Sequence, residues 1–478
     1  MKTFTKEELR SFEKFLQSPF LKPARDTTEL YNYIIKCYPD YDDLKLEKEK
    51  IYKKLFAGES FNEKKILNLI YDLTKAAEDF LAYSTIMKDE VDFLLNLSKG
   101  YLNKNLSDES HRVNKMIEKK LKPGFSPDKD YISKFRRLTF LKSSYYIENI
   151  DYENLLVAKR KYFEALAVQF IIDYSETVSA KIPAMETYGK NLESDFINSV
   201  IESFDLDKLL KMLEKSDYEN KHFIILHYYL LKMNDDKSYK FYFQLRDTFY
   251  ELLNLLDREE KCFIFSHLVN YCSQNYGSTK EDFRSEIFEV YKKMLENDCY
   301  SLSENEYMQE LTYRNILLSA IALKEFDWVG NFSEKYSTAL QPEYRDDLKN
   351  LSYAYIHFSK KEFEKALERV SKINHEFFLF KSDLKNLMLK IYYEMEYYEQ
   401  AFSMIDSYKH FLSYTNEITK SYKVLFSDFL GYYMMLLKIK CGESKELPSF
   451  IKKQIQKNSE VVNRIWLLEK AEELSKVF

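Results

Sequence analysis

The histidines and cysteines that could bind a metal ion recur at intervals of five residues. His227 follows His222 by five residues, and Cys262, His267 and Cys272 are separated by the same interval. Five residues advance an α-helix by about 500°, so neighbouring members of each set diverge by about 140°. Side chains three or four residues apart would share a helix face. We therefore expect packed histidines and buried cysteines here, and no zinc site.

The sequence lacks the motifs that usually carry phosphate, hydride or acyl-transfer chemistry. It contains no Gly-x-x-x-x-Gly-Lys-[Ser/Thr], Gly-x-Gly-x-x-Gly, His-Glu-x-x-His or Gly-x-Ser-x-Gly segment. With only 8 glycines in the chain, a phosphate-cradling loop is hard to build. The acidic pairs Asp42-Asp43 and Asp346-Asp347 fall near predicted helix starts, where negative charge is favourable in any case. We assign no catalytic residue and no cofactor, and expect a protein that is not an enzyme.

Two basic clusters keep an alternative function open. Arg136-Arg137 and Lys159-Arg160-Lys161 could contact phosphates, and some of the 40 Tyr and 36 Phe residues could stack on bases. The chain has 77 acidic and 72 basic residues, however, and this balance does not favour nucleic acid or an anionic membrane. Long cationic side chains more often form a solvated face, and aromatic rings more often fill the space between helices. Nucleic-acid association is therefore the second hypothesis.

The composition predicts that helices position all of these residues. Turn-rich β architectures need many glycines and prolines, and this chain of 478 residues has 8 of each. Helix-forming residues fill the long stretches between them. We predict an all-α fold, an α-solenoid of helical hairpins with a small N-terminal helical bundle.

Local signals mark the helix starts and the breaks. Thr5-Lys6-Glu7-Glu8 is a capping box, and Asn62 is expected to cap a long helix. The run Lys122-Pro123-Gly124 predicts a boundary, and Ile182-Pro183 together with Gly189 predicts a second break. We divide the chain into an N-terminal bundle (residues 1–122), a middle hairpin array (128–300) and a C-terminal array (301–478). A helix-turn-helix reading of the first bundle is disfavoured, because its third helix has acidic residues among its lysines.

Two segments near the C-terminus have similar sequences. Each has an apolar helix followed by an aromatic residue and, three positions later, a small one: Phe363 before Ala366, and Tyr398 before Ala401. The two alanines lie 35 residues apart, close to a period of about 34 residues. A weaker preceding unit carries Gly330 at the small position. Residues 310–414 thus resemble tetratricopeptide repeats, and the whole chain is similar to bacterial proteins described only by such repeats.

The resemblance implies a scaffold that binds an unidentified protein or peptide. The family requires small residues where its helices cross, and Ala354 takes a further small position, while Leu389 departs from the pattern. The family's ligand usually lies against the first helix of each unit. The implied partner-binding residues are Leu351, Tyr355, Phe358, Lys390 and Tyr393. The alternative is that these side chains pack against the preceding unit or against a folded-back neighbour.

The cysteines and the N-terminus indicate the cellular compartment in which the protein is expected. Five scattered cysteines without a Cys-x-x-Cys pair predict reduced thiols. The charged N-terminus has no apolar signal core, and the longest apolar runs are far shorter than the roughly 20 residues that a membrane span requires. We expect a cytoplasmic protein that does not enter the membrane.

Overall fold

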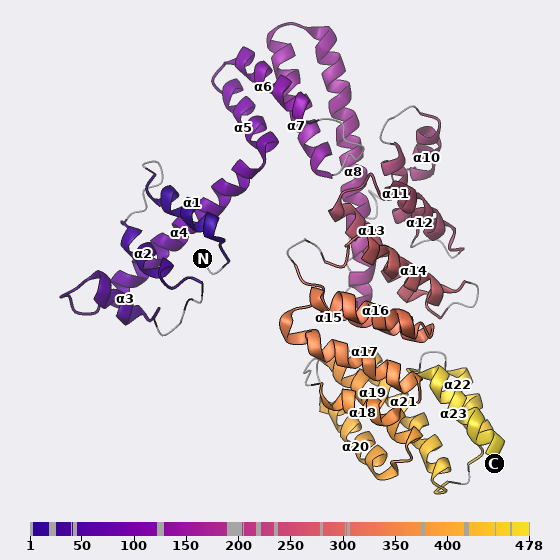
Figure 1. Ribbon diagram of the computed structural model, residues 1–478. Helices are drawn as coiled ribbons and strands as arrows, with labels where there is room; N and C mark the ends of the chain where they lie inside the picture. The colour runs from indigo at the N-terminus through magenta and orange to yellow at the C-terminus, as the bar shows by residue number, and fades with distance from the viewer. Residues whose placement is uncertain are drawn as a thin grey trace. The chain divides into compact units, whose positions relative to one another are not determined.

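The computed structural model confirms the all-α prediction. It describes residues 3–18, 25–39, 41, 45–121, 129–188, 203, 205–216, 221–233, 238–277, 281–301, 303, 306–373, 378–414, 420–444, 446–458 and 461–477. These residues form 22 α-helices, two short 3-10 helices and no strand. Successive helices pack on one another along the chain (Figure 1), which is the arrangement of a helical-hairpin array.

The chain divides into two compact units, Met1–Glu176 and Thr177–Phe478. The helices of the first unit are α1 (Lys6–Leu16), α2 (Thr28–Ile35), α3 (Lys48–Leu55), α4 (Glu63–Lys88), α5 (Glu90–Leu102), α6 (Ser107–Lys120) and α7 (Lys129–Glu148), followed by α8 (Tyr152–Tyr188), whose sequence continues into the second unit.

Two separate hydrophobic cores lie among the described residues of the first unit. Helices α1 to α4 share one core, in which the Phe12 ring contacts the rings of Tyr31 and Phe80. Helices α5 to α7 share the other, which includes Leu95, Ile117 and Leu138. The small N-terminal bundle is thus formed by α1 to α4.

The predicted helix starts in this unit are confirmed. The Thr5 hydroxyl accepts a hydrogen bond from the Glu8 amide at 3.2 Å, and the Glu8 carboxylate accepts one from the Thr5 amide at 2.9 Å. Asn62 accepts from the Lys65 amide at 3.0 Å and begins α4. Both residues act through hydrogen bonds within three positions, which is why the sequence alone locates them.

Of the two predicted breaks, the first lies outside the described residues. The second is wrong at Ile182-Pro183, but its other marker, Gly189, directly follows the end of α8. Helix α8 runs through Ile182-Pro183 and ends at Tyr188. A proline removes only one i→i−4 hydrogen bond, and a helix can continue through it with its other bonds retained. The boundary expected at residues 122–128 is outside the described part of the chain.

The helices of the second unit are α10 (Leu206–Glu214), α11 (Lys221–Met233), α12 (Lys240–Leu252), α13 (Arg258–Gln274), α14 (Phe283–Glu296), α15 (Glu310–Ala322), α16 (Phe326–Tyr336), α17 (Arg345–Ser359), α18 (Phe363–Ser371), α19 (Phe378–Glu394), α20 (Tyr398–Tyr414), α21 (Lys420–Lys440), α22 (Pro448–Lys457) and α23 (Arg464–Val477), with 3-10 helices η1 (Ser337–Ala339) and η2 (Pro342–Tyr344) between α16 and α17.

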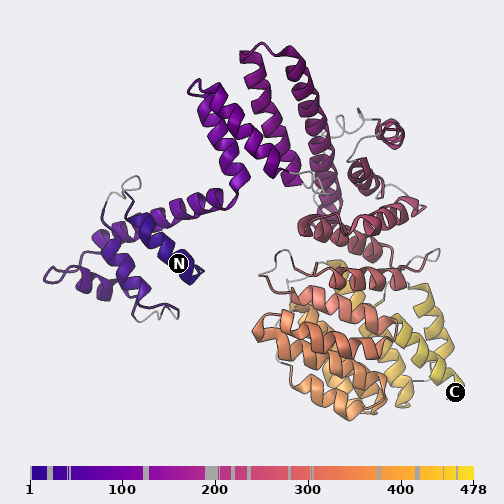
Figure 2. The same ribbon diagram turned by 45° about the horizontal axis from the view of Figure 1, so that its top comes forward.

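Helices α15 to α22 form consecutive antiparallel hairpins, seen from two directions in Figures 1 and 2. Ala354, Ala366 and Ala401, the small residues singled out in the sequence, are fully buried. A Cβ added to Gly330 would meet the Ile356 side chain at 4.0 Å, an ordinary contact. Small side chains let helices of neighbouring hairpins approach closely.

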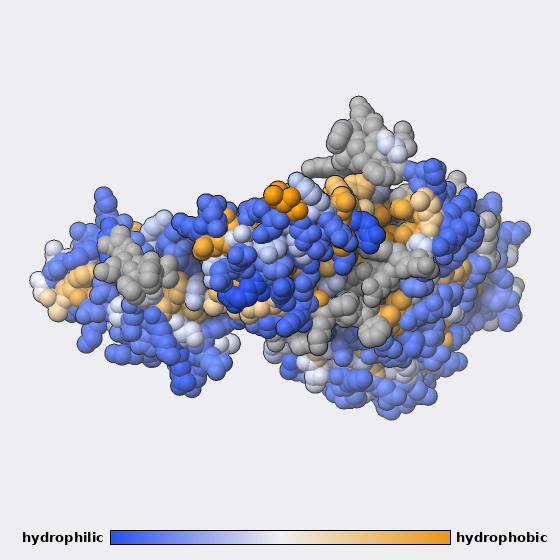
Figure 3. Space-filling view, turned by 90° about the horizontal axis from the view of Figure 1, so that it is seen from above, coloured by the Kyte–Doolittle hydropathy of each residue, from blue (hydrophilic) through white to orange (hydrophobic). Residues whose placement is uncertain are grey.

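One face of the protein is mixed in polarity. In the view of Figure 3, hydrophilic residues predominate and hydrophobic residues show in patches between them. No helix in the described part of the chain has both the length and the apolar content needed to cross a membrane.

Candidate functional site

Helices α17 and α19 carry all five predicted partner-binding residues. Leu351 and Tyr393 are 1% and 2% exposed, Tyr355 is 7% exposed and Lys390 is 8% exposed. Phe358 is half-buried and packs against the C-terminal core. The helical spacing places these side chains on the inner faces of their helices, but the rest of the chain covers most of them.

Three of the five residues meet in space. The Lys390 ammonium lies 5.7 Å from the centroid of the Tyr355 ring and 5.5 Å from that of Phe358. It also donates a hydrogen bond to the Asn463 side-chain oxygen at 3.2 Å. A cation held over two rings and one amide oxygen is partly compensated for its lost hydration.

Trp466 of α23 covers Tyr393, another of the five predicted residues. The Trp466 ring lies edge-on to Tyr393 at 5.2 Å and stacks on Tyr433 at 5.9 Å. The indole N–H donates to a Glu394 carboxylate oxygen at 3.3 Å, and Lys470 pairs with the same carboxylate at 2.8 Å. Helix α23 therefore packs against Tyr393, so the alternative of a folded-back neighbour describes this position. The partner-binding role of the five residues stays a prediction.

Asp383 lies about two helix turns before Lys390 on α19 and belongs to a buried ion pair. Arg314 of α15 binds Asp383 through two nitrogens, and its Nη2 donates to Oδ1 at 2.8 Å. Burial raises the pKa of Asp383, and the Arg314 guanidinium opposes that shift. Asp383, Asn386 and Lys390 follow the spacing of one helix face. The sequence analysis gave no signal for Arg314, which lies 69 positions from its partner.

Burial also affects Lys390. Its desolvation lowers the pKa to about 8 from a usual value of 10.5, and the Asp383 carboxylate partly offsets the effect. Below about pH 8 the folded and unfolded states both hold the proton, so the full cost of burying the charge is present. Between about pH 8 and pH 10.5 the unfolded chain binds more protons than the folded one, and stability rises with pH.

We expect Lys390→Met to remove this pH dependence. At pH 7 the variant should be as stable as the wild type or more stable, because an apolar side chain replaces a buried charge. Raising the pH from 7 to 10.5 should increase the free energy of unfolding of the wild type by up to about 3 kcal/mol relative to the variant, since one pKa unit corresponds to about 1.4 kcal/mol. Urea titrations of both proteins across this range measure the difference. If the difference in free energy of unfolding between the two proteins stays constant across this pH range, the pKa of Lys390 is not lowered.

The histidines and cysteines considered as metal ligands in the sequence contact different residues in the structure. His222 is exposed and His227 is fully buried, as their divergence on α11 predicts. The His227 Nε2 lies 3.2 Å from Glu260 Oε1. Burial lowers the pKa of the nearby His267 to about 4, with a smaller contribution from His227. No group of three or more metal-binding side chains occurs in the described ranges.

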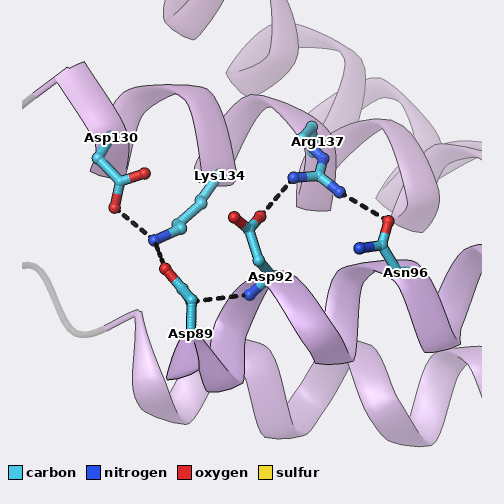
Figure 4. A network of polar contacts seen from close by, with 6 residues as sticks. All are labelled: Asp89, Asp92, Asn96, Asp130, Lys134 and Arg137. Atoms are coloured by element: carbon cyan, nitrogen blue, oxygen red, sulfur yellow. Dashed lines mark hydrogen bonds and ion pairs between the residues drawn. The ribbon is translucent and has the colours of Figure 1, made fainter. Parts of the chain in front are cut away.

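The first basic cluster holds two helices of the first unit together (Figure 4). Arg137 of α7 donates to Asp92 and Asn96 of α5. One turn earlier, Lys134 binds both Asp89 and Asp130. In the second cluster, Arg160 pairs with Glu164 at 3.5 Å. These carboxylates compete with phosphate for the same cations, which weakens the argument for nucleic-acid binding.

The chain was compared with protein-family models, with curated proteins and with solved structures, and none of the three comparisons gave a match.

Proposed function

We propose that the protein is a non-enzymatic interaction scaffold whose C-terminal third is tetratricopeptide-like. The observation that supports this most strongly is the burial of Ala354, Ala366 and Ala401 within consecutive helical hairpins. These are the positions at which the resemblance requires small residues. Stacked hairpins present an extended surface, and such surfaces serve to bind other proteins.

The proposed partner is an extended peptide or a protein segment with an apolar residue beside a charged one. Phe358 is half-buried and supplies apolar contact area near Lys390. The Asn386 side-chain oxygen is buried, and no hydrogen bond to it occurs within the described structure. A buried acceptor of this kind favours a ligand that brings an N–H donor. An apolar anchor would supply most of the binding energy.

A cytoplasmic location is also part of the proposal. All five cysteines are free thiols, and a reducing compartment maintains that state.

The test is capture of partners from native lysate by the full-length protein, with mass spectrometry of what is retained. We expect Phe358→Ala to lose the partners that the wild type captures, because the half-buried ring is the accessible apolar anchor of this surface. Phe450→Ala is the matched control, since Phe450 is 54% exposed on α22 and should retain the partners.

Two outcomes would overturn the proposal. If Phe358→Ala and the control variant both capture the same partners as the wild type, the binding surface does not lie on α17. Salt-sensitive binding of single-stranded nucleic acid near physiological ionic strength, in place of protein capture, would support the second hypothesis.

A further inference from the structure

Helix α8 exposes an apolar stripe along the first half of its length. Residues that alternate at spacings of four and three positions share one face of a helix, and this spacing is typical of a coiled-coil seam. Leu156 and Phe163 in this stripe are 71% and 62% exposed, and its other apolar members are at least 39% exposed. The six residues of the α8 stripe are Tyr152, Leu156, Lys159, Phe163, Leu166 and Phe170.

The opposite face of α8 already packs within the chain. Ala165, Val168 and Ile172 are buried, and their positions on the helix point away from the stripe. Helix α7 runs antiparallel to this part of α8 (Figure 1), and the Phe140 ring of α7 lies 6.1 Å from the Tyr162 ring. Helix α8 therefore has one packed face and one exposed apolar face.

The α8 stripe is large enough to form the centre of a stable interface. An aromatic side chain buries about 150–250 Å² when it leaves water completely. At their exposed fractions, the five apolar side chains of the stripe offer roughly 500 Å² per copy, compared with about 800 Å² that each partner buries in a standard interface. Apolar patches of this size are often interaction sites.

The α8 stripe is complementary to itself when a second copy lies antiparallel to it. A two-fold axis opposite position 161 places each residue across from the one that lies equally far beyond that position. The facing pairs are Tyr152 with Phe170, Leu156 with Leu166, and Lys159 with Phe163. The first two pairs bury apolar side chains, and the third places an ammonium beside an aromatic ring. In a parallel pair Lys159 would meet its own copy, and the two like charges would repel each other.

The charges beside the stripe fit the same arrangement. Arg160 and Glu164 lie along one edge of the stripe, with side chains that are 72% and 45% exposed, and they pair along the helix at 3.5 Å. The two-fold axis brings Arg160 of one copy near Glu164 of the other, and it does so twice in each dimer. Opposite charges that meet at the rim of an interface favour one register over the alternatives.

We propose that the α8 stripe is the interface of a homodimer, in which the α8 helices of two copies pack antiparallel through this face. The occupant is a second copy of the chain, because the stripe offers apolar area near that of a stable interface and because its apolar, cationic and rim positions complement themselves. The dimer does not depend on partner binding at α17 and α19.

Sedimentation equilibrium of the full-length protein tests the dimer. We expect the mass of two chains, with dissociation on dilution. Leu156→Glu and Phe163→Glu should each raise the dissociation constant of the dimer by about 30-fold or more, the loss typical of a central interface residue. Met212→Glu is the matched control, since Met212 is 63% exposed on α10, and it should leave the dimer unchanged. A monomeric wild type, or a dimer that both stripe variants leave intact, would overturn the proposal.

Cysteine cross-linking tests the antiparallel register. The background variant carries serine at Cys37 and Cys441, the two cysteines that are only partly buried. In this background, a mixture of Leu156→Cys and Leu166→Cys proteins should form an intermolecular disulfide, because the two positions face each other across the axis. Neither protein should cross-link by itself. A disulfide formed by Leu156→Cys protein alone would indicate a parallel pair and contradict the proposal.

Charge reversal tests the rim contacts without changing the apolar stripe. Arg160→Glu should weaken the dimer several-fold, and adding Glu164→Arg should restore most of the affinity. If the double variant dimerises as weakly as the single one, the two charges do not meet and the register is wrong. A monomeric wild type that instead sediments with vesicles of phosphatidylserine and phosphatidylcholine, and no longer does so as Leu156→Glu, would assign the stripe to a lipid surface and overturn the proposal.

Discussion

Replacing Asp383 with alanine is expected to lower the free energy of unfolding of the second unit by about 3–5 kcal/mol, because removing one partner of a buried ion pair leaves the other charge uncompensated. The side chains of Arg314 and Asp383 are only 16% and 8% exposed. Water cannot replace the lost carboxylate at such a site without opening the packing around these two side chains of α15 and α19. Hydrogen exchange of the amides in these two helices measures the local loss.

A double replacement separates two free energies: the cost of leaving one buried charge unpaired, and the net contribution of the ion pair to stability. Arg314→Met with Asp383→Leu should recover most of the lost stability, since apolar side chains of similar size can replace a buried ion pair without loss. The matched control is Glu368→Ala. Glu368 pairs with Lys372 at 2.6 Å, but both side chains are at least half exposed, so the change should cost little stability. A similar small cost for Asp383→Ala would show that the Arg314–Asp383 site is solvated.

Trp466→Ala is expected to lower the stability of the C-terminal helices by about 3–5 kcal/mol, because a large buried aromatic side chain is lost and a cavity remains. Trp466 is 9% exposed and touches Tyr393 of α19 and Tyr433 of α21. Amides of α19, α21 and α23 should all exchange faster in the variant. Unchanged exchange in α19 would show that α23 does not cover Tyr393 in solution.

The adjacent residue supplies the control. Ile465 lies on the same helix and is 50% exposed, so Ile465→Ala should change exchange little. Trp466→Phe keeps most of the ring contacts but loses the indole N–H that reaches Glu394, and an intermediate loss is expected. The same reasoning makes Tyr393 a poor probe of partner binding, since its replacement by alanine would disturb the fold itself.

Sequence-based prediction succeeded where the determining interactions are local. The shortage of glycine and proline excludes turn-rich folds, and helical periodicity within short windows identifies the individual helices. The caps at Thr5 and Asn62 depend on hydrogen bonds three residues away. The small residues Ala354, Ala366 and Ala401 were identified through the resemblance to tetratricopeptide repeats. The break expected at Ile182-Pro183 and Gly189 is wrong at the proline, because helix α8 continues to Tyr188 despite it.

The candidate site depends on contacts that no local pattern encodes. The resemblance to tetratricopeptide repeats implied Tyr355, Lys390 and Tyr393 as partner-binding residues, but an apolar face looks the same in sequence whether a partner or the chain itself covers it. Asn463 and Trp466, which contact Lys390 and Tyr393, lie 73 positions farther along the chain in each case. The Arg314–Asp383 pair likewise joins separate helices. Helical content is determined within a few residues, whereas burial and charge pairing are decided only when distant helices pack.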